Sequence, residues 1–380
     1  MKESLTSKLL KGLVKGTLGL LAYDFAYRLK HPRKQSYQAE VNLNEVDMSL
    51  QANLAWIEEE HYDRDMNIIA RPYIEQYEHS GEIPVGDVAL SYLFYLKDSN
   101  RPTVFIVHGF NEYKEMYFEV VYYLLQLNYN VLIYDARGHG SSRVETRNSL
   151  IDIQHFDYYI EDLKEVIESV KETYELNEHF FLFAHSMGGA VSTGLIKKYP
   201  KLIKAAILSS PMFSVNTYPY PRSLAHAVAS GAGLLNLGHK PLPAQGSNEF
   251  IEASTDASEY IPNPYLTHSQ QREKYAFNLR LESVAHPTSG GTYNWLATSL
   301  EQLNLIVDEL ALKNIETPLL VFRSVEDKVV REDGIFTAAT YLPQVELIAV
   351  DNAGHCIFQE HDEITKPYFS LISYFLKQYS

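Results

Sequence analysis

The chain has 380 residues, 46% of them hydrophobic, and a formal net charge of -15. This length and apolar content suffice for a large buried core, and the acidic balance argues against nucleic acid as a partner because a phosphate backbone would repel it. The single cysteine, Cys356, excludes an internal disulfide, and no run of 18 apolar residues predicts a transmembrane helix.

Residues 1–34 form a basic segment at the start of an acidic chain, with eight Lys or Arg and two acidic residues. On a helical wheel their leucines fall on one broad face, and Lys8, Lys11 and Lys15 cluster on the opposite face. The segment is therefore predicted to be a basic amphipathic helix, which suits either an anionic membrane surface or packing on the protein's own core. A secretory signal is disfavoured because charged residues interrupt the apolar run and no small-x-small cleavage site follows.

Residues 35–80 are polar and acidic, and we expect an N-terminal extension of helices or irregular structure. After it, strands and helices alternate along the chain, which predicts a doubly wound, mostly parallel α/β sheet. The predicted strands cover residues 88–96, 103–108, 131–135, 179–184, 205–209, 318–323 and 345–350. The predicted helices cover residues 113–127, 156–174, a stretch from 188 onward, 334–342 and 364–378.

One long interruption breaks this alternation. Residues 212–316 are rich in proline, aromatic and polar residues and are too many for a loop, so they are predicted to form an inserted cap. The cap divides an α/β core made of residues 81–211 and 317–380. Because it lies between the candidate nucleophile and its candidate partners in the chain, we expect it to cover the site.

The stretch around Ser186 has the pattern of a nucleophile elbow. An apolar and aromatic run ends at Ala184, and small residues suited to close helix packing start at Gly188. The five residues 184–188 are Ala-His-Ser-Met-Gly, which match G-x-S-x-G except for alanine in the first position. This strand-turn-helix pattern predicts a serine hydroxyl held clear of its strand at a helix N-terminus.

Ser186 also has candidate partners. A serine hydroxyl needs a histidine to take its proton and a carboxylate to hold that imidazole in the right tautomer. Asp327 and His355 each follow a late predicted strand, so both are expected at the same sheet edge as Ser186. Glu326 is the rival acid, and Asp351 is a further one. The order of serine, acid and histidine predicts a catalytic triad for acyl transfer.

Acyl transfer also needs hydrogen-bond donors for the tetrahedral oxyanion. In elbow-type hydrolases these are the backbone N–H of the residue after the nucleophile and one N–H from the loop after an early strand. The candidates are therefore the backbone N–H groups of Met187 and Phe110, whose side chains matter little for this role.

Other groups near the predicted site have no catalytic part assigned. His108 and His185 are expected to be packed, hydrogen-bonded histidines, and the turn at 135–140 is expected to be structural. No metal-ligand spacing or phosphate-binding glycine loop occurs, so no metal and no cofactor are predicted.

The motifs HGFNEY, DARGHGSS, FDYYIEDL, AHSMGG, SSPMF, LTHSQQR and SGGTYNW occur in this order. Together they resemble the lysophospholipase L2 family of α/β-hydrolases, whose wider kin are the monoacylglycerol lipases. The resemblance runs from about residue 50 to the C-terminus and includes the cap motifs at 266–272 and 290–295. The pair Val329-Val330 resembles the family pattern after the triad acid, which favours Asp327 over Glu326. The alanine in the elbow and the basic N-terminal segment are departures.

The resemblance implies the α/β-hydrolase fold and hydrolysis of the single acyl ester of a lysophospholipid. It also implies a protein held loosely at the cytoplasmic face of a bacterial inner membrane. Tyr293 and Trp295 follow a Gly-Gly pair in the cap. They are candidates for the wall or entrance of an apolar acyl pocket, or for packing within the cap.

Three other functions remain open at this point. One is a monoacylglycerol lipase or general carboxylesterase with the same chemistry. Another is an aminopeptidase, in which Glu252, Asp256 and Glu259 would bind the free amine of a peptide, although these acidic residues are more typical of a solvated loop. The last is an inactive binding module, which the presence of all three triad candidates argues against.

Overall fold

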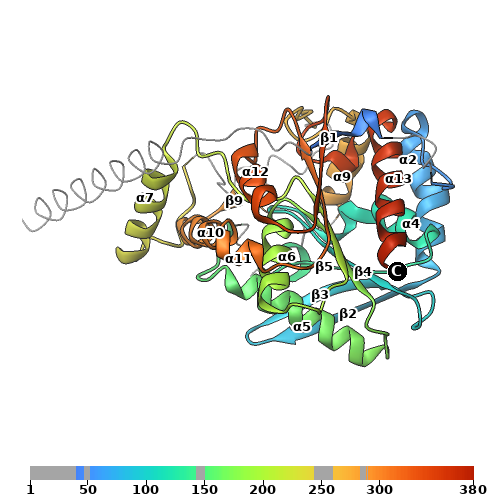
Figure 1. Cartoon of the computed structure of the whole chain (residues 1–380), viewed down its shortest axis with the longest axis horizontal. Coiled ribbons are helices and arrows are strands. Elements are labelled where there is room, and N and C mark those ends of the chain that lie inside the picture. The colour runs from blue at the N-terminus through green and yellow to red at the C-terminus, as the bar shows by residue number, and fades with distance from the viewer. Residues whose placement is uncertain (1–39, 47–51, 143–149, 244–259, 283–287, 289) are drawn as a thin grey trace, which may run out of the picture.

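A nine-stranded sheet forms the centre of the molecule (Figure 1). The computed structural model describes residues 40–46, 52–142, 150–243, 260–282, 288 and 290–380. The strand order is β1-β11-β10-β8-β7-β4-β5-β3-β2. The strands are Val41–Asn42 (β1), Glu78–Val85 (β2), Val88–Tyr95 (β3), Thr103–Val107 (β4), Asn130–Tyr134 (β5), Phe180–His185 (β7), Ala205–Ser209 (β8), Leu319–Ser324 (β10) and Val345–Val350 (β11).

Most neighbouring strands of this sheet are parallel. Only the pairs β2 with β3 and β3 with β5 are antiparallel among its described strands. In the middle of the sheet Ala184 of β7 lies between Val107 of β4 and Leu208 of β8. Because the carboxyl ends of parallel strands meet at one edge, the loops after β4, β7, β10 and β11 lie close together.

Helices cover both faces of the sheet (Figure 1). The α-helices are Tyr62–Asp65 (α2), Arg71–Glu75 (α3), Phe118–Gln126 (α4), Asp157–Thr173 (α5), Met187–Lys198 (α6), Arg222–Leu234 (α7), Gln270–Leu281 (α9), Tyr293–Ile306 (α10), Glu309–Lys313 (α11), Glu332–Tyr341 (α12) and Asp362–Tyr379 (α13). Short 3-10 turns are Leu43–Glu45 (η1), Glu59–His61 (η3), Lys114–Tyr117 (η5), Gly140–Ser142 (η6) and Ile357–Gln359 (η8). A π-helical turn, Met66–Ala70 (η4), joins α2 to α3.

Two hydrophobic clusters hold these layers together. Successive side chains of a strand point to opposite faces, and in β7 Phe180 and Leu182 join one cluster while Phe181 and Phe183 join the other. Side chains of α5, α6, α10 and α12 complete the first cluster. Side chains of α4, α13 and residues 52–74 complete the second. The helices therefore sandwich the sheet, as a doubly wound fold requires.

The predicted fold class, a doubly wound and mostly parallel α/β sheet, is confirmed. β8 and β11 have the predicted bounds, and the other predicted strands and helices differ from the structure by a few residues at most. Residues 35–80 are predicted to be helices or irregular structure, but β1 lies within this range and β2 begins in it, and neither strand is predicted from the sequence. β2 is an edge strand with mostly exposed residues, so no apolar run marks it.

The segment 212–316, expected as an inserted cap, contributes to both clusters. α10 packs with α7 and α6, whereas α9 packs against η3, α2 and η5. A two-stranded sheet joins the insertion to the core, with Leu150–Ile151 (β6) parallel to Gly290–Gly291 (β9). The predicted N-terminal helix at 1–34 and the acidic residues Glu252, Asp256 and Glu259 lie outside the described residues. Among the helices that the structure describes, none has the length and apolar character needed to cross a membrane.

Candidate active site

Ser186 occupies the turn between β7 and α6. Its φ of 49° and ψ of -116° lie in a region that residues with side chains rarely adopt. A Cβ atom at Gly188 would lie 2.0 Å from the carbonyl oxygen of Val107, so only glycine lets α6 approach β4 this closely. The local geometry is that of a nucleophile elbow, with the serine at the carboxyl end of a central strand.

His355 connects Ser186 to Asp327. The Nε2 atom of His355 lies 2.8 Å from Oγ of Ser186, and Nδ1 lies 2.7 Å from Oδ2 of Asp327. The other carboxylate oxygen of Asp327 accepts hydrogen bonds from the backbone N–H groups of Val329 and Val330. Since these two amides fix the carboxylate, its second oxygen is available to the imidazole. The structure thus brings together the three residues that the sequence nominates for the triad.

The rival acids lie elsewhere. Glu326 is exposed to solvent. Asp351 accepts a hydrogen bond of 2.6 Å from the side-chain amide of Asn42, the last residue of β1. Of the three carboxylates considered from the sequence, Asp327 is the one in contact with His355.

The insertion holds the loop that carries His355. The backbone N–H groups of His355 and Cys356 donate to the carbonyl oxygens of Tyr265 and Leu266, at 2.9 and 2.7 Å. A Cβ atom at Gly354 would lie 2.5 Å from the Leu266 oxygen, which explains the glycine before the histidine. Leu266 is the first residue of the LTHSQQR motif. The motif therefore supports the loop that carries His355, a role that was not predicted from the sequence.

Arg272 anchors the same motif in the core. Its side chain is fully buried and pairs with the carboxylates of Glu119 on α4, at 3.1 Å, and Asp362 on α13, at 2.8 Å. The guanidinium also lies over the ring of Tyr62, 4.8 Å from its centroid. Helix α9 is therefore fixed to both flanking helices by one buried charge.

The two candidate oxyanion donors lie on adjacent elements. Met187 is the first residue of α6, where a backbone N–H has no partner within its helix. Phe110 lies in the loop after β4, and its ring packs on Trp295 with centroids 4.0 Å apart. Within the described part of the chain, neither N–H donates a hydrogen bond. Both are therefore free to bind a developing negative charge.

The two cap candidates differ in their surroundings. Trp295 is buried in the first hydrophobic cluster, and a Cβ atom at Gly291 would lie 3.1 Å from its ring and 3.2 Å from that of Phe110. Tyr293 is half-buried at the start of α10. Trp295 of the SGGTYNW motif thus packs its indole ring against Phe110, the candidate oxyanion donor in the loop after β4.

His108 and the turn after β5 brace that loop. Nε2 of His108 accepts from the backbone N–H of Ala136 at 2.9 Å, so the ring carries its proton on Nδ1, which donates to the Gly109 oxygen. Asp135 binds the ammonium of Lys114 at 2.6 Å. The turn thus has the structural role expected from the sequence, because it supports the loop after β4.

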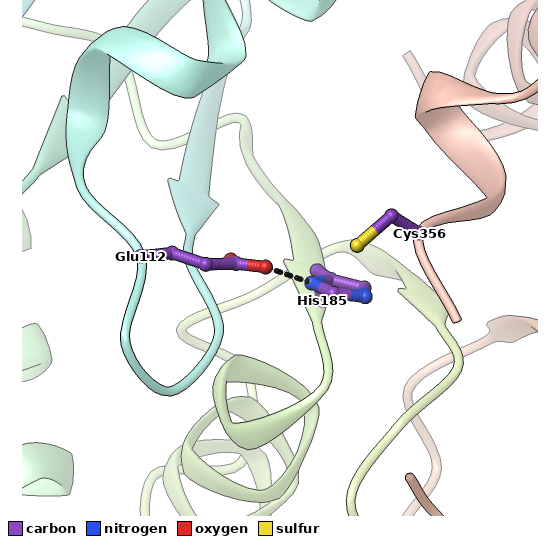
Figure 2. A group of neighbouring side chains, drawn as sticks. All are labelled: Glu112, His185 and Cys356. Carbon is purple, nitrogen blue, oxygen red and sulfur yellow. Dashed lines mark ion pairs between the residues drawn. The ribbon is translucent and has the colours of Figure 1, made fainter. Parts of the chain in front are cut away.

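Three buried side chains, those of Glu112, His185 and Cys356, form a group next to the elbow, since His185 directly precedes Ser186 (Figure 2). Glu112 Oε1 is 2.9 Å from Nδ1 of His185, and the ligand-type atoms of Glu112, His185 and Cys356 lie within 4.8 Å of one another. Sequence reasoning assigned Glu112 no role, because nothing in its local pattern shows that it meets His185. Glutamate, histidine and cysteine are side chains that can bind zinc, but the positions of these three in the sequence do not have the spacing of a metal-binding motif.

The charges of this group are already balanced without a metal. Burial alone would raise the pKa of the Glu112 carboxyl, but the charge and hydrogen bond of His185 and the Tyr117 hydroxyl lower it to about 2. Burial alone would lower the pKa of His185, and the Glu112 carboxylate raises it above its ordinary value. Burial raises the pKa of the Cys356 thiol well above its usual range. The raised pKa values of His185 and Cys356 disfavour the deprotonated forms that bind a metal, and the contact of His185 with Glu112 has the distance of an ion pair.

Comparisons with known proteins agree with this fold. The family model described as serine aminopeptidase, S33, matches residues 98–362. The probable lysophospholipase L2 of Haemophilus influenzae is 24% identical over 311 residues, which cover 80% of this chain and 94% of that protein. The monoglyceride lipase of Rattus norvegicus is 25% identical over 282 residues, which cover 72% and 83% of the two chains.

A solved structure shows the same fold. It is that of a soluble variant of the monoglyceride lipase from Saccharomyces cerevisiae in complex with a substrate analog, with a TM-score of 0.62 and 17% identity over 80% of this chain and 96% of that one. The resemblance inferred from the motifs is confirmed by these proteins. Because the family model matches more than half of the sequence, the chain belongs to the serine aminopeptidase, S33, family of α/β-hydrolases and is a hydrolase of the esterase and lipase type.

Proposed function

We propose that this protein is a lysophospholipase that cleaves the single acyl ester of a lysophospholipid through an acyl-enzyme on Ser186. The observation that carries the proposal is the row of hydrogen bonds from Ser186 through His355 to Asp327, at 2.8 and 2.7 Å. Asp327 accepts a hydrogen bond from the Nδ1–H group of His355, which leaves Nε2 free to take the proton of the Ser186 hydroxyl. The serine oxygen then attacks the ester carbonyl.

The same histidine completes both halves of the reaction. After attack it donates the proton to the departing alcohol, and in the second half it removes a proton from the water that hydrolyses the acyl-enzyme. The N–H groups of Phe110 and Met187 stabilise the oxyanion in each tetrahedral intermediate. No metal or other cofactor takes part in this sequence of steps.

The substrate class rests on the relatives and on the apolar residues of the cap. Relatives named lysophospholipase L2 and monoglyceride lipase both point to a lipid with one acyl chain. Trp295 and Tyr293 are proposed to border the acyl site, because Trp295 lies against Phe110 beside the proposed oxyanion donors. Residues 1–34 are proposed to bind the anionic cytoplasmic face of a bacterial inner membrane.

A matched panel of substrates tests this function. Purified protein is given a lysophospholipid, a monoacylglycerol of the same acyl chain, a short soluble ester and an aminoacyl amide. We expect the highest kcat/KM on the lysophospholipid and no hydrolysis of the amide. Trp295→Ala, assayed in parallel, is expected to lose more activity on the long-chain substrates than on the short ester.

Other results in this panel would assign a different function. Preference for the monoacylglycerol identifies a monoacylglycerol lipase, and preference for the short ester identifies a general carboxylesterase. Release of an amino acid from the amide identifies an aminopeptidase. Inactivity on all four substrates favours a binding module.

A further inference from the structure

Both ring nitrogens of His185 face hydrogen-bond acceptors. Nδ1 is 2.9 Å from the Glu112 carboxylate, and Nε2 is 3.2 Å from the backbone oxygen of His355. Nε2 has the geometry of a hydrogen bond to the His355 oxygen, whereas Nδ1 meets the carboxylate at the distance of an ion pair. Its neighbour Glu112 raises the pKa of the buried His185, which favours the imidazolium form that pairs with this carboxylate (Figure 2).

The carboxylate of Glu112 also holds the start of the loop after β4. Its Oε2 atom accepts from the backbone N–H of Gly109 at 2.5 Å and from the hydroxyl of Tyr117 at 2.6 Å. A Cβ atom at Gly109 would lie 2.8 Å from Oε2, so glycine permits this close approach. Because Gly109 immediately precedes Phe110, the position of the carboxylate sets the path of the chain into the proposed oxyanion donor.

We propose that Glu112 and His185 are positioning residues for the hydrolysis. Their ion pair joins the loop with Phe110, the strand end that bears Ser186, and the backbone of His355. The inference rests on the proposed function, since it assigns these two residues a role in orienting the proposed catalytic groups. Oxyanion donors stabilise the transition state more than the bound substrate, so their misplacement lowers kcat more than it raises KM.

The test compares Glu112→Gln, His185→Gln and the double variant with the parent, using a short soluble ester. Cys356→Ala is the matched control, because it alters the third member of the same buried group without touching the ion pair. The concentration of active sites is measured by titration with a fluorophosphonate, so that unfolded protein does not count. Melting temperature and bound zinc are measured for every sample.

Each single variant is expected to lose about 10- to 100-fold in kcat per titrated site with KM within about threefold, somewhat less than removal of a complete oxyanion donor. The double variant is expected to lose no more than the worse single one, because each single change leaves one buried charge without its partner. Cys356→Ala is expected to keep the parental kcat.

Several results would overturn this role. Single variants with parental kcat per titrated site and only a lower melting temperature would show that the ion pair merely stabilises the fold. Losses that multiply in the double variant would show that the two residues act independently. One bound zinc per parent molecule, absent from Cys356→Ala, would identify a metal site in place of the ion pair.

A milder change covers the case in which Glu112→Gln does not fold. Glu112→Asp keeps the negative charge but is one methylene shorter, so it cannot reach both His185 and the Gly109 N–H. We expect a lower kcat with a nearly unchanged melting temperature, and an unchanged kcat contradicts the proposal.

Ser186→Ala distinguishes failure of the proposed function from failure of the positioning role. If it retains activity the proposed function fails, whereas if it is inactive and Glu112→Asp is fully active only the positioning role fails.

Discussion

The backbone at Ser186 is strained, and its neighbours maintain the strain. A residue with a side chain in this region of φ and ψ costs on the order of 1–3 kcal/mol. The N–H of Ser186 donates to the Ser209 oxygen, and its own oxygen accepts from the N–H groups of Gly189 and Met212, at 2.9 and 2.8 Å. These three bonds tie the turn to β8 and α6, which keeps the hydroxyl at the same place beside His355.

Asp327 is expected to matter far more than its neighbour Glu326. Asp327→Asn presents an amide to His355 and disturbs the imidazole tautomer, so we expect a loss of about 10⁴-fold in kcat. Glu326→Gln alters an exposed side chain and is expected to change kcat less than twofold. Steady-state kinetics on a short ester measure both, and a larger loss in Glu326→Gln would move the acid's role to that residue.

Acid is expected to weaken the Glu112–His185 pair. The lowered pKa of Glu112 means that its ionised form stabilises the protein above about pH 4.5, and this contribution is lost as the pH falls toward about 2. The raised pKa of His185 means that the stabilisation by its protonated form is complete below about pH 6.5. This stabilisation is therefore constant in the acidic range where Glu112 titrates.

The double variant Glu112→Gln/His185→Gln has neither charge and serves as the reference. From the pKa of Glu112 near 2, we expect the parent's advantage in unfolding free energy to be about 2 kcal/mol smaller at pH 3 than at pH 5.5. Urea unfolding at the two pH values measures it. A pH-independent difference would contradict the charged state of Glu112.

Among the elements, the buried strands were predictable from sequence and the edge strands were not. β8 and β11 carry apolar runs whose bounds match the prediction because both faces of the sheet are covered. β2 is mostly exposed, and β1 has only two residues, so neither has a periodic signal. The triad candidates could be predicted from the sequence because each follows a predicted strand and the three occur in a known order. The Glu112–His185 contact could not, because it depends on tertiary packing alone.

Helix α9 shows how an inserted element can support the site. Arg272→Met removes the buried cation and leaves Glu119 without its partner, so we expect a loss of about 3–5 kcal/mol in unfolding free energy. Lys274→Met on the same helix alters an exposed side chain and is the control, with an expected change below about 0.5 kcal/mol. Urea unfolding compares them, and equal effects would mean that the buried network contributes little.

At the scale of the whole molecule, charge divides the chain into two unlike parts. Residues 1–34 have eight basic and two acidic residues, whereas the remainder has 25 basic and 46 acidic residues. An anionic membrane attracts the first part, by about 1 kcal/mol per basic residue near the surface, and repels the second. The basic segment is therefore the expected point of membrane contact.

Removal of residues 1–30 tests this directly. We expect the truncated protein to lose sedimentation with anionic liposomes while it hydrolyses a short soluble ester at nearly the parental rate. Liposomes of zwitterionic lipid are the control, to which neither protein should bind strongly. Persistent binding to anionic liposomes, or unfolding of the truncated protein, would assign the segment to the core.

The central claim is that Ser186 is the nucleophile of this hydrolase. The most direct measurement is labelling with a fluorophosphonate, followed by mass spectrometry of the peptides, for the parent, Ser186→Ala and the control Ser192→Ala, which alters another buried serine on α6. We predict one adduct, on Ser186, in the parent and in Ser192→Ala. Ser186→Ala should be unlabelled and should lose at least about 10⁴-fold in kcat while it stays folded. An adduct on another residue, or labelling of Ser186→Ala at the parental rate, would contradict the claim.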